Sequence, residues 1–121
     1  MRVQGIHHVS IKVDDVDAAL HFYVDVLGMK VREDRPDFDF EGAWLDAVGQ
    51  QVHLIKGDLP TAEGQHFAVL VDDLPTVVDE LRGVGLEVTD PVPSGRSLQS
   101  FVHDPSGNRV ELHQPNAVPV A

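Results

Sequence analysis

The sequence contains no cysteine among its 121 residues. Disulfide bridges and thiolate metal sites are therefore excluded, and any metal ion would have to bind His, Asp or Glu side chains. Long apolar runs are also missing, and the N-terminus has no basic segment followed by an apolar one. From these absences we predict no membrane partner and no signal peptide, with the cytoplasm as the default location.

Basic residues are scarce as well. Nine Lys and Arg stand against 20 Asp and Glu, which gives a net charge of −11. Binding to nucleic acid needs clustered Lys and Arg to neutralise phosphates, so we expect no nucleic-acid partner. The acidic residues are interpreted as a solvated surface, and a cationic ligand is the alternative. The hydrophobic content of 42% is ordinary for a globular protein and too high for a disordered one.

The sequence does contain an internal repeat. The segment His8–Asp15 returns in similar form 58 residues later as His66–Asp73. The same offset relates His53 to Glu111, and each of these two residues lies between a valine and a leucine. Each copy therefore has one potential metal ligand near its start and one near its end.

The repeat defines the predicted domain organisation. A length of 121 residues suits one compact domain, and half of that length buries too little surface to be stable alone. We therefore predict a single domain, 1–121, made of two repeats at about 1–58 and 64–116.

Hydrophobic periodicity predicts strand, helix and then three strands in each half. In the first half these are Ile6–Val13, Val16–Leu27, Met29–Arg35, Gly42–Val48 and Gln51–Ile55. In the second half they are His66–Val71, Leu74–Val84, Leu86–Thr89, Leu98–His103 and Arg109–His113. A linker is expected at Gly57–Gln65, a loop at Pro91–Gly95, and a loose tail from Pro115 onward.

Strand alternation assigns faces to the candidate ligands. Successive side chains of a strand point to opposite sides. His8 lies opposite its apolar neighbour Val9, and His53 and Glu111 lie opposite their flanking valine and leucine. The candidate ligands are thus predicted on polar faces that can line a cavity.

These segments resemble the vicinal oxygen chelate superfamily, which includes glyoxalase I, extradiol dioxygenases and bleomycin resistance proteins. The matching segments are His8–Asp15, Phe22–Gly28, His66–Asp73 and Asp104–Leu112, and the last is the most specific. The resemblance implies an α+β class with two βαβββ modules forming curved mixed sheets around a shared metal cavity. It also implies a homodimer, because small members usually dimerise.

The resemblance also implies a ligand set. In such proteins the ligands lie on the first and last strands of each module, which maps them to His8, His53, His66 and Glu111. Three imidazoles and one carboxylate suit a divalent Zn, Ni, Co, Mn or Fe ion. The implied protein is a lyase or isomerase whose small substrate chelates the ion through two oxygens, with Glu111 as catalytic base. Whether the site is closed or keeps open positions is left undecided.

Other functions remain alternatives. Glyoxalase I usually has a carboxylate where this chain has His53, and no cluster of arginines marks a glutathione pocket, so lactoylglutathione is not assigned as substrate. An Fe(II) extradiol-type dioxygenase uses two His and one Glu, and a fourth ligand would crowd its oxygen site. A fosfomycin-modifying transferase typically uses three ligands. A non-catalytic antibiotic-binding protein of the bleomycin type would suit the acidic charge but normally lacks these ligands.

Four further histidines are not assigned as metal ligands. His7 is adjacent to His8 on the strand, so its side chain faces the side opposite to the candidate ligands. It is interpreted as a core or interface residue. His113 has the parity of Glu111, which allows a role as acid or base at the cavity rim, although a surface position is favoured. His21 and His103 are interpreted as surface residues.

Some non-histidine residues also bear on the cavity. Ser10, Lys12 and Arg109 share its face by parity, so they can either orient an anionic substrate or simply add solubility. Trp44 can line a pocket or fill the core, and the core is favoured.

Overall fold

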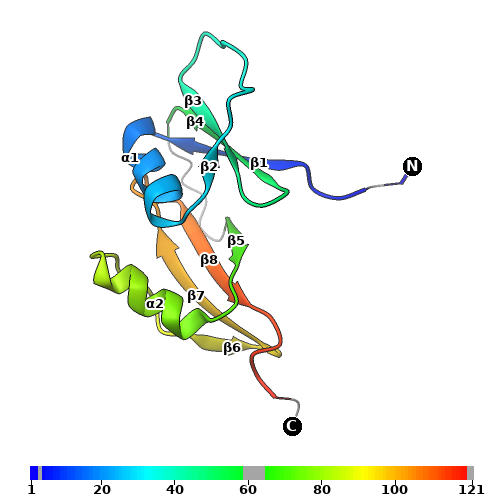
Figure 1. The fold of residues 1–121 in the computed structure, drawn as a ribbon, viewed down its shortest axis with the longest axis vertical. Coiled ribbons are helices and arrows are strands. Elements are labelled where there is room, and N and C mark those ends of the chain that lie inside the picture. The colour runs from blue at the N-terminus through cyan, green and yellow to red at the C-terminus, as the bar shows by residue number, and fades with distance from the viewer. Residues whose placement is uncertain (3, 59–64, 120–121) are drawn as a thin grey trace. The chain divides into compact units, whose positions relative to one another are not determined.

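The computed structural model describes residues 1–2, 4–58 and 65–119 (Figure 1). The chain divides into two compact units, Met1–Thr61 and Ala62–Ala121, and each is described by itself. Most of the predicted linker, 59–64, lies outside the described residues.

The first unit contains one four-stranded sheet and one helical segment. Its elements are β1 (His8–Val13), α1 (Val16–Leu20), the π-helical η1 (His21–Val26), β2 (Lys30–Val31), β3 (Gly42–Asp46) and β4 (Gln51–Lys56). The strand order is β1-β4-β3-β2. Strand β1 runs parallel to β4, and the other neighbours are antiparallel.

The second unit repeats this plan. Its elements are β5 (His66–Leu70), α2 (Leu74–Gly83), β6 (Val92–Ser94), β7 (Ser97–His103) and β8 (Arg109–Gln114). The strand order is β5-β8-β7-β6, again with one parallel pair, between β5 and β8. Each unit is therefore a βαβββ module with a mixed sheet, and the predicted α+β class is confirmed.

The two helical segments begin in the same way. Asp15 accepts a hydrogen bond from the Ala18 amide at 3.0 Å, and Asp73 accepts one from the Thr76 amide at 3.5 Å. Such side-chain caps satisfy amides that have no partner within the helix. The paired aspartates that end the first strand of each repeat therefore start the helix that follows.

The first helix does not continue as an α-helix to Leu27, as the periodicity predicted. It changes to a π-helix at His21. Phe22 and Tyr23 are adjacent and both buried, with ring centroids 4.9 Å apart at 87°. We attribute the wider turn to the burial of two neighbouring aromatic rings, which a regular amphipathic α-helix would place further apart around its axis.

One face of each sheet packs against the helix of the same unit. In the first unit the buried side chains include Val13, Ala19, Phe22, Tyr23, Ala43, Leu45, Val52 and Leu54. In the second they include Leu74, Val78, Leu81, Val102, Val110 and Leu112. Burial of these apolar side chains stabilises each unit by roughly 25 cal/mol per Å² removed from water. The other face of each sheet is left for polar residues.

Three predicted segments differ from the structure: one strand is shorter, one strand is missing, and one predicted loop contains a strand. The strand predicted at Met29–Arg35 shortens to β2, although the Arg32 amide still donates to the Trp44 carbonyl at 2.8 Å. The Arg32 side chain pairs with Asp34 at 2.8 Å and with Asp46 at 3.3 Å. The edge strand of the second unit is β6, within the predicted loop, and not Leu86–Thr89. Pro93 is tolerated there because one side of an edge strand needs no hydrogen bonds.

The tail is also more ordered than predicted. The amides of Ala117 and Val118 both donate to the Arg96 carbonyl, at 2.9 and 3.0 Å. No helix in the described part of the chain is both long and apolar enough to cross a membrane.

The turn between β7 and β8 is organised by a buried carboxylate. Asp104, 4% exposed, accepts hydrogen bonds from the Ser106 amide at 2.9 Å and from the Asn108 amide at 2.7 Å. Its second oxygen accepts one from the Asn108 side chain at 2.8 Å. Asp104 therefore fixes the direction of the chain in the turn that precedes Glu111.

We expect Asp104→Ala to lower the free energy of unfolding by about 3 kcal/mol, because it leaves buried donors without an acceptor. The repeat-related Asp46→Ala is the matched control. It removes only a partly exposed ion pair with Arg32 and should cost less than about 1 kcal/mol. Urea unfolding followed by circular dichroism measures both values. Equal losses for the two variants would contradict this role of Asp104.

Candidate functional site

In the first unit, His8 and His53 lie together on the polar face of the sheet. Strands β1 and β4 are parallel neighbours with Ser10 paired to His53, so His8 lies one same-face position away. The two imidazoles stack with centroids 4.0 Å apart and planes at 11°. Ser10 and Lys12 lie exposed on the same face.

Trp44 extends this stack from the third strand. Its ring lies 4.2 Å from that of His53, at 8°, and Trp44 is paired with His53 in the register of β3 and β4. The prediction that Trp44 fills the core is wrong, because Trp44 is half-exposed on the polar face while its neighbours Ala43 and Leu45 are buried. Three rings thus cross three strands in one row.

His53 is the most buried of these rings, at 7% exposure. Its Nε2 lies 2.9 Å from Gln51 Oε1, and because an amide oxygen can only accept, His53 donates here and keeps Nδ1 free of the proton. Burial, with the nearby imidazoles of His8 and His7, lowers the pKa of His53 below its ordinary value. A neutral imidazole is the form that binds a metal ion.

His7 lies outside the core. It is exposed, and its Nδ1 lies 2.9 Å from His8 Nδ1. Of the two interpretations of His7, the core is therefore wrong, and an interface position stays a prediction.

In the second unit, His66 and Glu111 lie together in the equivalent place. Strands β5 and β8 pair Ala68 with Glu111, as β1 and β4 pair Ser10 with His53. His66 Nε2 lies 3.1 Å from Glu111 Oε1. The Glu111 side chain is 12% exposed, although the residue belongs to the face that points away from the core.

His113 holds the other oxygen of the same carboxylate. Its Nδ1 lies 2.8 Å from Glu111 Oε2, so His113 donates from the next same-face position of β8. His113 is thus a neighbour of the candidate ligand, and its side chain, 34% exposed, lies at the surface as favoured. Its role as acid or base stays a prediction. His103 and His21 are exposed, as predicted, and His21 pairs with Asp25 on the helix.

Arg109 lies in the same row of the sheet as His66. The two residues are register partners, and the Arg109 guanidinium carbon lies 3.7 Å from the centroid of the Phe101 ring. Phe101 also meets the edge of His66, with centroids 5.7 Å apart at 87°. Phe101 therefore supports both side chains.

Each unit thus supplies two candidate ligands, and within the described residues no three His, Asp or Glu side chains gather in a group that could hold a metal ion. The geometry of one pair, His66 with Glu111, is compatible with a shared metal ion. Two donor atoms that bind one ion at about 2.1 Å, at right angles, stand about 3 Å apart. His66 Nε2 and Glu111 Oε1 have this separation. A divalent ion could therefore replace the proton that they share.

Sequence reasoning missed Gln51 and Phe101. Both could have been found from parity, because side chains two residues apart on a strand share a face and residues paired across strands do too. Gln51 lies two residues before His53, and Phe101 is the register partner of Glu111.

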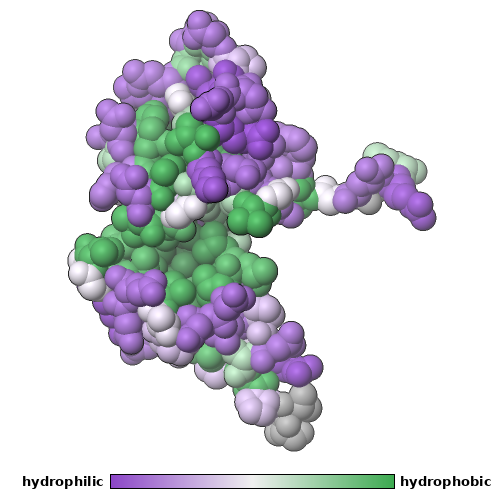
Figure 2. Space-filling view, viewed as in Figure 1, coloured by the Kyte–Doolittle hydropathy of each residue, from purple (hydrophilic) through white to green (hydrophobic). Residues whose placement is uncertain are grey.

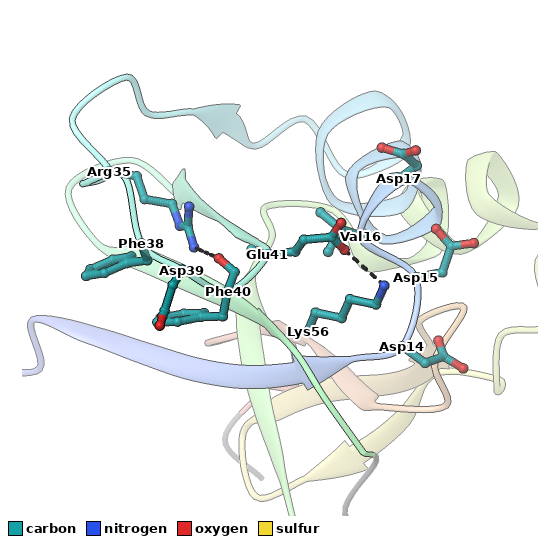
Figure 3. Close-up of a pocket in the computed structure, with 11 residues that line it drawn as sticks. Asp14, Asp15, Val16, Asp17, Arg35, Phe38, Asp39, Phe40, Glu41 and Lys56 are labelled. Carbon is teal, nitrogen blue, oxygen red and sulfur yellow. Dashed lines mark hydrogen bonds and ion pairs between the residues drawn. The ribbon is translucent and has the colours of Figure 1, made fainter.

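A pocket of about 770 Å³ lies at one end of the first sheet, apart from His8 and His53 (Figure 3). Its lining includes five carboxylates, from Asp14, Asp15, Asp17, Asp39 and Glu41, together with Arg35, Phe38, Phe40 and Lys56. Figure 3 shows Glu41 and Lys56 turned toward each other, and they pair at 3.0 Å. Phe38 packs against Trp44 at 6.2 Å, which connects one wall of the pocket to the ring stack.

Known proteins resemble this chain over most of its length. A protein of Synechocystis sp. named probable lactoylglutathione lyase is 33% identical over 125 residues, which cover 91% of this chain and 95% of that protein. A probable chloroplastic lactoylglutathione lyase of Arabidopsis thaliana is 29% identical, and the match spans 36% of its length. A crystal structure from Bacillus anthracis, provisionally named a glyoxalase family protein, matches with a TM-score of 0.86 and 27% identity over 95% of this chain and 98% of that one.

The sequence profile of one family matches residues 5–112, from just before β1 into β8. This range contains all four candidate ligands. The chain belongs to the Glyoxalase/Bleomycin resistance protein/Dioxygenase superfamily.

Proposed function

We propose that the chain is a divalent-metal-dependent enzyme of glyoxalase-like type, a lyase or isomerase that acts on a small substrate with two adjacent oxygens. One observation carries the proposal. The parallel strand pair of each unit brings two candidate ligands together at repeat-related positions, His8 with His53 and His66 with Glu111. The names of the relatives, probable lactoylglutathione lyases, support the same class of reaction.

A complete site takes one pair from each kind of unit, either in one chain or across a homodimer. The four residues give three neutral nitrogens and one carboxylate, a donor set that suits Zn, Ni, Co, Mn or Fe(II). When bound, such an ion would act as a Lewis acid on two substrate oxygens and make the adjacent C–H bond more acidic.

Glu111 is the proposed base for that proton, which it would accept after leaving the metal ion. Its Oε2 is held by His113 and its Oε1 lies against His66, so the carboxylate has a fixed orientation on the open face of the sheet. A base must be held within hydrogen-bonding reach of the carbon that loses its proton.

This chain differs from the usual glyoxalase I ligand set at His53, where glyoxalase I usually has a carboxylate. An imidazole in place of a carboxylate makes the site more positive by one charge, which strengthens the Lewis acid and removes one possible base. The proposed substrate class is therefore broad, a small molecule that chelates through two oxygens. A panel of methylglyoxal–thiol adducts, catechols and fosfomycin tests this class. Turnover of a catechol with oxygen uptake would instead support an extradiol-type dioxygenase.

The second candidate function is non-catalytic binding of a cationic antibiotic. The acidic pocket in the first unit favours it, because its lining has five carboxylates against two cationic side chains, Arg35 and Lys56. Metal content separates the two functions, since only the enzyme requires the ligand pairs.

We expect purified protein to contain about one divalent ion per chain, and EDTA to remove the ion and lower the melting temperature. His8→Ala, His53→Ala, His66→Ala and Glu111→Ala should each lose most of the metal, because each removes one of four ligands. His21→Ala, on the exposed helix surface, is the control and should keep it. Mass spectrometry of the metal and thermal unfolding measure both effects. No loss of metal or stability on chelation would favour the binding protein.

We expect Gln51→Leu and His113→Leu to weaken metal binding about 10- to 100-fold while leaving the fold intact. Each variant removes the hydrogen bond that fixes a candidate ligand, on His53 in one unit and on Glu111 in the other. Gln50→Leu and His103→Leu, at exposed positions, are the matched controls. Competition with a chromophoric chelator measures the dissociation constants. Affinities equal to those of the controls would show that the two hydrogen bonds do not orient ligands.

A further inference from the structure

The sheet face that carries His66 and Glu111 differs in charge from the rest of the chain. Net charge is −11, yet Glu111 is the only acidic residue within strands β5, β6, β7 and β8. Figure 2 shows where hydrophilic side chains gather instead, over the loop that joins β2 to β3 at the top of the view. That loop, 32–41, holds five carboxylates.

Both oxygens of Glu111 are already engaged. Oε1 lies against His66 and Oε2 against His113. Arg109 is two residues away on the same strand and the same face, but it forms no ion pair or hydrogen bond of its side chain with any described residue. Its guanidinium is instead laid over Phe101 at 3.7 Å.

This arrangement leaves the Arg109 guanidinium available to bind an anion. Stacking on an aromatic ring restricts the guanidinium but leaves its N–H donors, at the edge of the plane, without partners. A planar fork of donors matches the two oxygens of a carboxylate or phosphate. The negative charge on the rest of the chain would repel an anionic group. This face instead carries one arginine together with His66, His103 and His113.

We propose that Arg109 binds an anionic group, a carboxylate or a phosphate, on the substrate that chelates the proposed metal ion. The inference rests on the proposed function and narrows its substrate class. The α-carbons of Arg109 and Glu111 are separated by two strand residues, about 7 Å. The anionic group must therefore lie within a few bonds of the two chelating oxygens, in one small molecule.

Hydroxamic acids test the inference, because they bind metal ions through two adjacent oxygens. Three probes are compared by calorimetry on the cobalt-loaded full chain: acetohydroxamic acid, which has no further anionic group, the monohydroxamic acid of succinate, and a phosphonate-bearing hydroxamic acid of equal length. Wild-type protein should bind at least one anionic probe about tenfold or more tightly than acetohydroxamic acid. The tighter anionic probe identifies the group.

Arg109→Gln should abolish this preference and leave the affinity for acetohydroxamic acid unchanged, which also shows that the site is intact. Arg109→Lys should keep part of it, because charge remains but the planar fork is lost. Arg96→Gln, an exposed arginine in the same unit, is the control and should behave as wild type. If Arg109→Gln keeps the full preference for the anionic probe over acetohydroxamic acid, the inference about Arg109 is wrong and the proposed function still stands. A wild-type chain that binds no cobalt would overturn the proposed function as well.

Discussion

Parallel pairing between the first and last strands of each unit is the constraint on which the candidate site depends. Strands β1 and β4, and likewise β5 and β8, lie far apart in sequence within their module but next to each other in the sheet. The helix and two strands between them provide the crossover that a parallel pair requires. In both units the register then brings together two residues whose side chains face away from the core. A slip of one residue would turn every candidate ligand toward the apolar interior.

The repeat made most of the fold predictable. Strand alternation and helical periodicity identified ten elements, and nine of them correspond to elements of the structure. The exceptions have local causes that a hydrophobic pattern does not contain. Strand β2 ends at Val31, although the Arg32 amide still donates to Trp44 of β3. Two adjacent aromatic residues widen the first helix into π turns. The edge strand moved from Leu86–Thr89 to β6 because pairing with β7, and not hydrophobic content, decides where an edge strand forms.

The candidate site was predictable only in part. Parity and the offset of 58 residues placed His8 and His53, and His66 and Glu111, on suitable faces. The neighbours of these residues were not predictable in the same way, because the repeats differ there. Gln51 corresponds to Arg109 and Ile55 to His113. One module therefore fixes its candidate ligand from the preceding same-face residue, and the other from the following one. The two repeats share the positions of the pairs, while the residues around them differ in chemistry.

The ring stack has a consequence for observing the protein. Trp44 is the sole tryptophan of the chain, and it lies flat against His53, which lies flat against His8. An excited indole in direct contact with an imidazole can transfer an electron to it, so indole emission is sensitive to the protonation or ligation of that imidazole. The fold thus contains its own optical reporter, in contact with a candidate ligand and free of background from any second tryptophan.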